Sequence, residues 1–292
     1  MDRTLCLIDG DVIAYIACKA RDDTVSDERY LEQSWNNFVR QTNGIVELCY
    51  ADDYLMAVKS SLNYRDIIYP DYKANRRNKP DTNYNYFVPI IRQMAIDEGL
   101  AIEAVGREAD DMLRIWAVEA QKEGDEHIIC SIDKDLKCIP GKYFNVKSNE
   151  LQVIEPLEAT RFYYEQLLKG DSTDNIPGIP KVGEVKAKKM LSSGCTEEDF
   201  RRLVAAAYYD YYDDAWKDYL LANGKMIYLQ GHEDDYFEIS SWGIEFASST
   251  PQEVPTVSAG AATGIGGWLP PGSAENKRPG KCTTLNFKIP GV

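Results

Sequence analysis

The fold that this sequence predicts is decided by residues 5–11, which read Leu5-Cys6-Leu7-Ile8-Asp9-Gly10-Asp11. Four apolar residues in a row are typical of a strand that is buried on both faces, as in a parallel sheet. The polar turn that follows predicts a helix from about Val12, with Asp11 as its N-cap. We therefore expect a strand-to-helix unit at the start of the chain.

The same order of strand and helix recurs through residues 1–155. Further strands are expected at 54–58, 100–104 and 128–132, and helices at 27–48, 84–98 and 109–122. Strands that alternate with helices indicate an α/β fold with a mostly parallel central sheet flanked by helices. Residues from about 65 to 98 would form a helical arch inserted into this core, because Pro70 can start a short helix that Pro80 ends.

A helical subdomain is expected over residues 156–246. Its predicted helices span 157–169, 185–191, 197–207 and 215–229. Residues 247–292 are rich in Gly, Pro, Ser and Thr and hold few large apolar side chains. Such a segment cannot bury enough surface to fold, so we expect a low-complexity, disordered tail.

The whole chain is acidic: its 292 residues carry 33 Lys and Arg against 47 Asp and Glu, for a net charge of −14. Basic residues nevertheless gather over residues 59–79 and 181–189, and these two islands can contact a polyanion. No apolar run approaches the roughly 20 residues that span a bilayer, so we expect a cytoplasmic protein with no membrane partner. Seven scattered cysteines and two histidines predict neither a disulfide framework nor a zinc site.

Acidic residues stand where the predicted strands end. Asp9 follows the first strand and Asp133 the strand at 128–132, and the carboxyl ends of parallel strands share one edge of a sheet. Two carboxylates 4 Å apart repel by about 4 kcal/mol at an effective dielectric constant of 20, so a cluster calls for cations. Taken alone, each acid can equally be a helix cap or a solvated charge. The acids that we expect to converge are Asp9, Glu108, Asp110, Asp111, Asp133, Asp135, Asp171 and Asp174.

Oxygen ligands without histidine or cysteine favour hard divalent ions, Mg²⁺ or Mn²⁺. A cluster of this size suits two ions that hold the attacking and leaving oxygens of a phosphodiester. Lys73 and Arg76 lie three residues apart, on one face of the short helix expected at 71–77. They can hold the phosphate that is cleaved, or they can simply face solvent.

Residues 175–183 form a turn rich in Gly and Pro before a Lys-rich helix. The turn is similar to a helix-hairpin-helix motif, in which backbone N–H groups at the start of a helix hold a phosphate. This similarity predicts contact with the backbone of a nucleic acid.

In order and spacing, these motifs resemble the 5′-nuclease family, which includes flap endonucleases and phage 5′→3′ exonucleases. The resemblance covers residues 4 to about 192. It rests on the motifs at 7–11, 63–65, 72–76, 108–111, 131–135, 170–175 and 178–183.

The resemblance implies an enzyme that hydrolyses phosphodiester bonds of DNA, as a 5′→3′ exonuclease or a flap endonuclease. Two Mg²⁺ or Mn²⁺ ions are implied, one held by Asp9, Glu108, Asp110 and Asp111 and the other completed by Asp133, Asp135, Asp171 and Asp174. Lys73 and Arg76 would be catalytic and act on the scissile phosphate from the arch. The hairpin would grip duplex DNA with a bound K⁺ ion. The implied DNA contacts are Arg65, Lys73, Arg76, Arg77, Gly178, Lys181, Gly183 and Lys186.

RNA paired to DNA is a second expected substrate, as in primer removal during DNA replication. We expect a monomer whose tail contacts another replication protein. One departure stands out, because members commonly carry an aspartate just after the second strand. Lys59, Ser60 and Ser61 occupy that place, with Ser60 as the closest counterpart, so the first metal would have one carboxylate fewer.

Two alternatives stay open at this point. Asp9 and Asp11, with residues 170–174, also look like the motifs of haloacid-dehalogenase-type phosphatases, in which Asp9 would be phosphorylated. A non-catalytic DNA-binding replication scaffold is the other, because Ser60 replaces a carboxylate. Metal-dependent cleavage separates the three functions.

Overall fold

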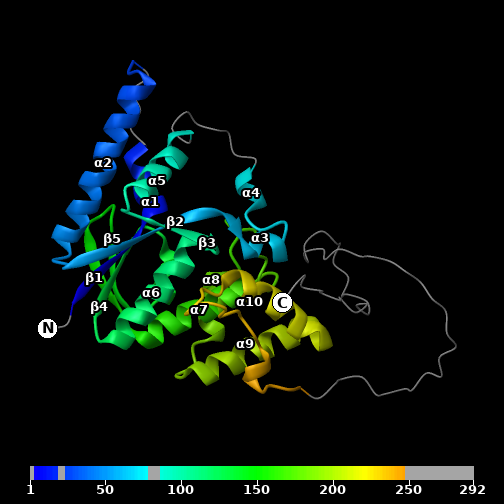
Figure 1. Cartoon of the computed structure of the whole chain (residues 1–292). Coiled ribbons are helices and arrows are strands. Elements are labelled where there is room, and N and C mark those ends of the chain that lie inside the picture. Colours follow the sequence, from blue (N-terminus) through cyan, green and yellow to red (C-terminus); the bar gives the residue numbers. More distant parts are fainter. Residues whose placement is uncertain (1–2, 19–23, 78–85, 247–292) are drawn as a thin grey trace.

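The computed structural model describes residues 3–18, 24–77 and 86–246 (Figure 1). A six-stranded sheet with the order β3-β2-β1-β4-β5-β6 lies at its centre. The first five strands are parallel to their neighbours, and β6 is antiparallel to β5. The predicted α/β class is therefore confirmed. The strands are β1 (Thr4–Asp9), β2 (Asp53–Asn63), β3 (Ile102–Gly106), β4 (Glu126–Ser131), β5 (Gly141–Asn145) and β6 (Glu150–Ile154).

Strand β1 is the point at which the order of the sheet reverses. Its residue Leu7 pairs with Leu55 of β2 on one side and with Ile129 of β4 on the other. In open parallel sheets, a crevice for ligands forms at the carboxyl ends of the strands on the two sides of such a reversal. Asp9 ends β1 and Asp133 follows β4 by two residues, so both acids lie at this crevice.

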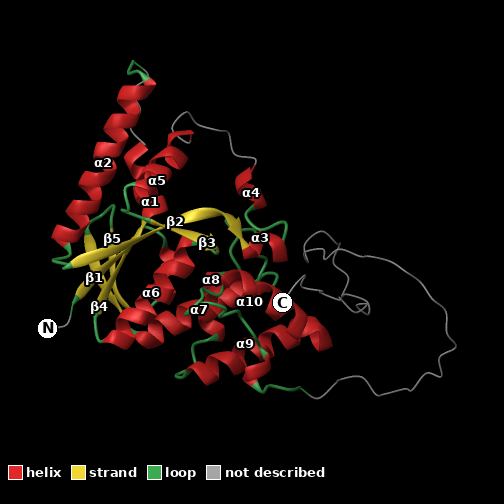
Figure 2. Ribbon diagram, in the orientation of Figure 1, coloured by secondary structure: helices red, strands yellow, loops and turns green. Residues whose placement is uncertain are grey.

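Alternate residues of β1 face two different cores. Cys6 and Ile8 pack with the helices α1 (Gly10–Cys18), α2 (Asp27–Leu48) and α5 (Phe87–Asp97) on one face of the sheet. Leu5 and Leu7 pack with α6 (Ala109–Glu123) on the other face. Figure 2 shows the sheet between these two layers of helices.

A third core belongs to the helical region that follows the sheet. Helices α7 (Pro156–Lys169), α8 (Glu184–Met190), α9 (Glu197–Tyr212) and α10 (Trp216–Ile227) form it. Tyr69 and Tyr72 are buried in the same core, although they come from the segment between α3 (Tyr64–Ile68) and α4 (Ala74–Arg77). The segment after β2 is thereby held against the helical region.

Several local predictions are corrected. Helix α1 begins at Gly10, and the N–H of Val12 donates to Asp9, so Asp9 and not Asp11 caps its first turn. Strand β2 runs on to Asn63, and its register with β3 shifts between Lys59 and Asn63. The antiparallel pair of β5 and β6 was not predicted. The expected helix over 71–77 forms only from residue 74, and α3 precedes it.

Two predictions concern residues outside the described part of the chain. They are the disordered tail at 247–292 and the centre of the helical arch at 78–85. In the part that is described, no helix is both long and apolar enough to cross a membrane.

Candidate active site

A cleft of about 1000 Å³ opens at the carboxyl ends of β1 and β4. Basic side chains, among them Lys59, Lys73, Arg76 and Arg92, line it together with a larger group of acids. The acids that line it are Asp9, Asp11, Asp66, Glu103, Glu108, Asp110, Asp133, Asp135, Asp171 and Asp174. The structure thus brings together seven of the eight acids that the sequence predicted, all but Asp111, and adds Asp11, Asp66 and Glu103.

Asp9 is the most buried of the lining carboxylates. One of its oxygens accepts a 2.8 Å hydrogen bond from the hydroxyl of Ser131, and the other accepts the N–H of Val12 at 3.2 Å. Burial raises the pKa of Asp9 to about 7, and the nearby charge of Asp11 adds to the rise. A bound cation would stabilise the ionised carboxylate of Asp9 and so lower this pKa.

Asp133 and Asp135 lie on the loop that follows β4. Asp133 accepts the N–H of Asp135 at 2.9 Å, and Asp135 accepts a 2.8 Å hydrogen bond from the side-chain amide of Gln166 on α7. Burial, followed by the charge of Asp133, raises the pKa of Asp135 to about 7. The carboxylates are thus oriented by neutral donors, which leaves their charge uncompensated.

Asp110 projects from the first turn of α6 toward the same group. Burial, with the charges of Asp9 and Asp133, raises its pKa well above the ordinary value. The set of ligands is carboxylate oxygen only, and these carboxylates repel one another. Hard divalent ions relieve such repulsion and prefer oxygen, so the residues present fit Mg²⁺ or Mn²⁺.

Two basic residues reach the opposite side of the cleft. The ammonium group of Lys73 pairs with Glu108 and lies 3.5 Å from Asp174, and the guanidinium of Arg76 pairs with Asp174. The hydroxyl of Tyr72 donates to Glu108 at 2.9 Å. Lys73 and Arg76, which were predicted to act together, therefore lie together beside two of the predicted metal ligands.

Two predicted roles are corrected by a buried ion pair. The side chains of Arg65 and Asp111 are both fully buried, and the two nitrogens of the guanidinium lie 2.6 and 2.8 Å from the two carboxylate oxygens. Asp111 also accepts the backbone N–H groups of Glu108 and Gln230. Neither side chain is free for the role that the sequence predicted, contact with DNA for Arg65 and metal binding for Asp111.

Ser60 lines the cleft at the position where the family resemblance predicts an aspartate. Its hydroxyl accepts the N–H of Leu62 at 3.3 Å. Asp11 also lies at this end of β2: its oxygens accept the N–H of Lys59 at 3.2 and 3.3 Å, and one of them lies 2.5 Å from Nε of Arg92. The sequence showed no reason to place Asp11 here.

The predicted hairpin connects α7 to α8. Lys181 and Lys186 are exposed, as is Gly183, the N-cap of α8. Gly178 differs, because it is buried against Gly170 and its N–H donates to Asn223 at 3.2 Å. Gly178 is therefore a packing position, which corrects its predicted contact with DNA. The side chain of Arg77, another predicted contact, lies outside what the structure describes.

Sequence reasoning missed the neutral side chains that orient the acids: Ser131, Gln166 and Tyr72. Ser131 and Tyr72 lie in motifs that had been recognised, but hydroxyls carry no charge pattern that singles them out.

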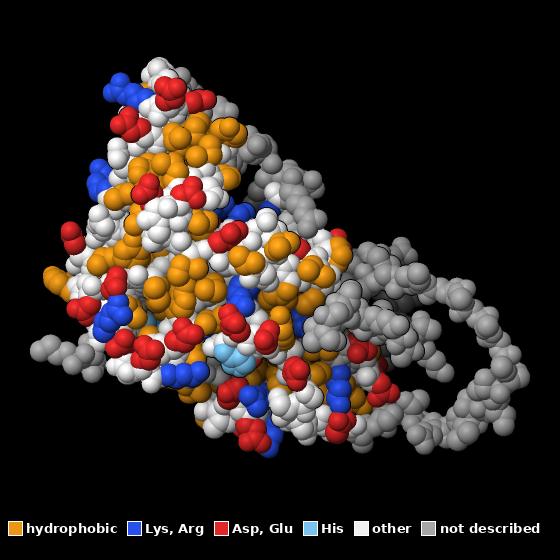
Figure 3. Space-filling view, in the orientation of Figure 1, with side chains coloured by type: hydrophobic (Ala, Val, Ile, Leu, Met, Phe, Trp, Pro, Cys, Tyr) orange, Lys and Arg blue, Asp and Glu red, His pale blue; other side chains and the backbone are white. Residues whose placement is uncertain are grey.

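On the face shown in Figure 3, acidic and basic side chains are interspersed.

The fold and the cleft define an α/β protein with an acidic site suited to divalent cations at the switch point of its sheet. Residues 4–165 match the family model described as 5′-3′ exonuclease, N-terminal resolvase-like domain. The chain therefore belongs to the 5′-3′ exonuclease family, as the resemblance predicted, and by homology it is a hydrolase. The phosphatase alternative is thereby set aside.

Curated relatives agree with this assignment. The chain is 24% identical over 200 residues to a 5′-3′ exonuclease of Buchnera aphidicola, a match that covers 65% of this chain and 70% of that protein. It is 30% identical over 214 residues to DNA polymerase I of Bacillus caldotenax, over 68% of this chain and 24% of the polymerase. The chain thus corresponds to a minor part of the polymerase.

Solved structures share the fold. The D15 protein of phage T5, co-crystallised with metal ions, superposes with a TM-score of 0.53 at 15% identity, over 75% of this chain and 97% of that one. The D15 flap endonuclease in a complex with DNA and metal ions superposes with a TM-score of 0.52 at 14% identity, over 77% and 99% of the two chains.

Proposed function

We propose that this protein is a divalent-metal-dependent 5′-nuclease that hydrolyses phosphodiester bonds of DNA. The observation that carries the proposal is the cleft in which seven predicted carboxylates face Lys73 and Arg76. Family membership and the T5 flap endonuclease, which is described with DNA and metal ions, support DNA as the substrate.

The proposed ligands of two Mg²⁺ or Mn²⁺ ions are the seven predicted carboxylates that line the cleft. When bound, the ions would supply an activated water and stabilise the charge that develops on the phosphate. The residues Ser131 and Gln166 orient Asp9 and Asp135 for this role. The proposed ligands are Asp9, Glu108, Asp110, Asp133, Asp135, Asp171 and Asp174.

Lys73 and Arg76 would bind the scissile phosphate. Both now pair with Glu108 or Asp174, so an entering phosphate and metal ions would exchange partners with them. Their cationic groups would then face the phosphate oxygens, where charge-assisted hydrogen bonds are strong. This assigns the two residues to the chemical step.

We propose a division of labour between two parts of the chain. Residues 1–155, together with Asp171 and Asp174, would carry the chemistry, and the hairpin that connects α7 to α8 would hold the duplex, with Lys181, Gly183 and Lys186 at the phosphates. These three residues are exposed, which such contacts require. The family resemblance also implies K⁺ at this turn, and duplex binding that is stronger in K⁺ than in Na⁺ would support it.

A digest of DNA labelled at the 5′ end or the 3′ end, as duplex and as flap, tests the proposal. Cleavage is expected with Mg²⁺ and none with chelator, and product lengths separate exonuclease from flap endonuclease activity. Hybrids of RNA and DNA test primer removal. Asp110→Ala should abolish turnover while DNA binding in Ca²⁺ survives. Binding without any metal-dependent cleavage would instead favour the scaffold.

A further inference from the structure

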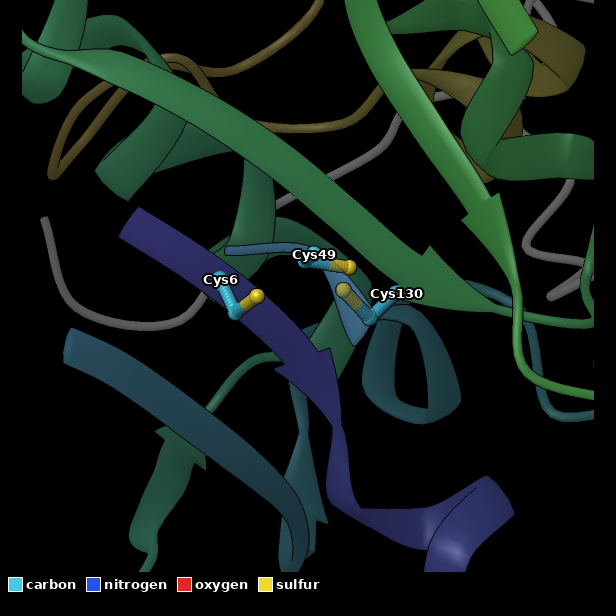
Figure 4. Close-up of side chains that lie close together, drawn as sticks. All are labelled: Cys6, Cys49 and Cys130. Atoms are coloured by element: carbon cyan, nitrogen blue, oxygen red, sulfur yellow. The ribbon is translucent and has the colours of Figure 1, made fainter. Parts of the chain in front are cut away.

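Three cysteines far apart in the sequence meet beneath the sheet. Cys6 lies on β1, Cys130 on β4, and Cys49 is the C-cap of α2. Their sulfur atoms all lie within 4.8 Å of one another, and Figure 4 shows the three side chains pointing toward one another. Among the described residues, no other group of three Cys, His, Asp or Glu side chains brings its ligand atoms this close.

The spacing of the sulfurs matches what a thiophilic ion requires. A Zn–S bond is about 2.3 Å, so the three sulfurs around one Zn²⁺ ion lie about 4 Å apart. The three cysteines come from three elements that the core already holds in place. The ion would therefore enter a site whose ligands are gathered in advance.

The three thiols differ in how readily they ionise: the pKa of Cys6 and that of Cys130 are raised above the ordinary value, so a bound cation would have to displace their protons. Hydrogen bonds from the thiols of Cys130 and Cys6 lower the pKa of Cys49, and the ammonium of Lys142 acts in the same direction. Cys6 and Cys130 are fully buried, whereas Cys49 is partly exposed as a residue. Three thiolates around a divalent ion carry a net charge of −1, which Lys142 would partly offset.

We propose that Cys6, Cys49 and Cys130 form a binding site for a thiophilic d¹⁰ cation, separate from the carboxylate cleft. Soft thiolate ligands select Zn²⁺ and Cu⁺ over Mg²⁺. Divalent Zn²⁺ compensates more of the charge of three thiolates than monovalent Cu⁺ does, which favours Zn²⁺ at this buried site. Bound there, the ion links the end of α2 to β1 and β4, the two strands that deliver Asp9 and Asp133.

The test uses the full chain, reduced and freed of metal, in excess Mg²⁺ so that the carboxylates are occupied. Cd²⁺ serves as the probe, because thiolate ligands give it an ultraviolet charge-transfer band that carboxylates do not. We expect one equivalent of Cd²⁺ to produce the band and to raise Tm. Zn²⁺ and Cu⁺ are added in separate experiments, and each should displace Cd²⁺ if it binds more tightly. The ion that displaces Cd²⁺ at the lower concentration is the preferred one.

Variants locate the site. Cys49→Ser should abolish the band, and because Cys49 is partly exposed this change should leave the fold intact. Cys195→Ser, at an exposed cysteine outside the cluster, and Asp133→Ala, in the carboxylate cleft, should both retain it. No band in the unmodified protein, or an undiminished band in Cys49→Ser, would overturn the proposal and leave the three cysteines as ordinary core packing.

Discussion

Arg65 and Asp111 form a bidentate ion pair that no solvent reaches, with N–O distances of 2.6 and 2.8 Å. Arg65 makes two further hydrogen bonds: its Nε donates to the carbonyl of Met226 and a terminal nitrogen to that of Tyr228. Both partners were predicted at the site, and both instead hold the wall of the cleft in place.

Breaking this pair should unfold the protein more readily. Removing one partner of a buried pair leaves an uncompensated charge and typically costs about 3–5 kcal/mol. Arg65→Met should therefore lower the free energy of unfolding by about that much in urea titrations. Arg76→Met, at an exposed arginine of the same cleft, is the control and should change stability little. Equal effects of the two substitutions would show that burial of Arg65 does not matter.

Lys73 should act on the rate of cleavage. Loss of a positioned cation at the reacting phosphate should lower the single-turnover rate by about 100-fold at saturating DNA. Affinity for DNA should stay within a few fold. Rapid-quench measurements and binding in Ca²⁺ separate the two quantities for Lys73→Ala. A variant that binds weakly but cleaves at the full rate would contradict the assignment.

Lys181 and Lys186 should act on binding. Each phosphate contact that is lost should reduce the slope of log affinity against log salt by about 0.9. Lys181→Ala and Lys186→Ala are therefore expected to weaken duplex binding and flatten this slope, with the saturated rate unchanged. Lys122→Ala, at the end of α6 away from its active-site end, is the matched control. An unchanged slope in both hairpin variants would refute the proposed grip.

A substitution at Ser60 is predicted to improve activity at low Mg²⁺ concentration, whereas the substitutions above reduce stability, rate or binding. Because Ser60 lines the cleft, Ser60→Asp should restore a carboxylate and lower the Mg²⁺ concentration for half-maximal activity. Leu62→Asp, at an exposed position two residues along β2, should leave the Mg²⁺ titration unchanged. If Ser60→Asp has no effect either, Asp11 at the same end of β2 is the carboxylate to test next.

The raised pKa values of Asp9 and Asp135, each about 7, predict how stability depends on pH without metal. Between about pH 4 and pH 7 the folded protein binds more protons than the unfolded chain, so stability falls as pH rises through this window. Chemical unfolding at several pH values in chelator should show the fall. Asp9→Asn should make it shallower, and Mg²⁺ should restore stability at pH 8. Parallel pH curves for the two proteins would count against burial as the cause.

The sequence predicted the parallel strands β1 to β4 because each contains a short apolar run, but it missed β5 and β6. It also placed Asp9 and Asp133 at one edge, since parallel strands share their carboxyl ends. It could not separate Asp110 from Asp111: adjacent positions on a helix point in different directions, and the direction depends on packing against Arg65. Nor could it group Cys6, Cys49 and Cys130, because their contact depends on the fold and not on local spacing.

The contacts of Arg65 and Asp111 also bear on the order in which the protein is made. Their partners Met226, Tyr228 and Gln230 are synthesised more than a hundred residues after α6. Domains fold as units during synthesis from the N-terminus, but here the ion pair between α3 and α6 needs a segment that is synthesised much later. A ribosome that has released only the family-matched residues 4–165 therefore presents a cleft whose wall is not yet closed. The nascent chain can complete these contacts at the cleft only when residue 230 has emerged from the ribosome.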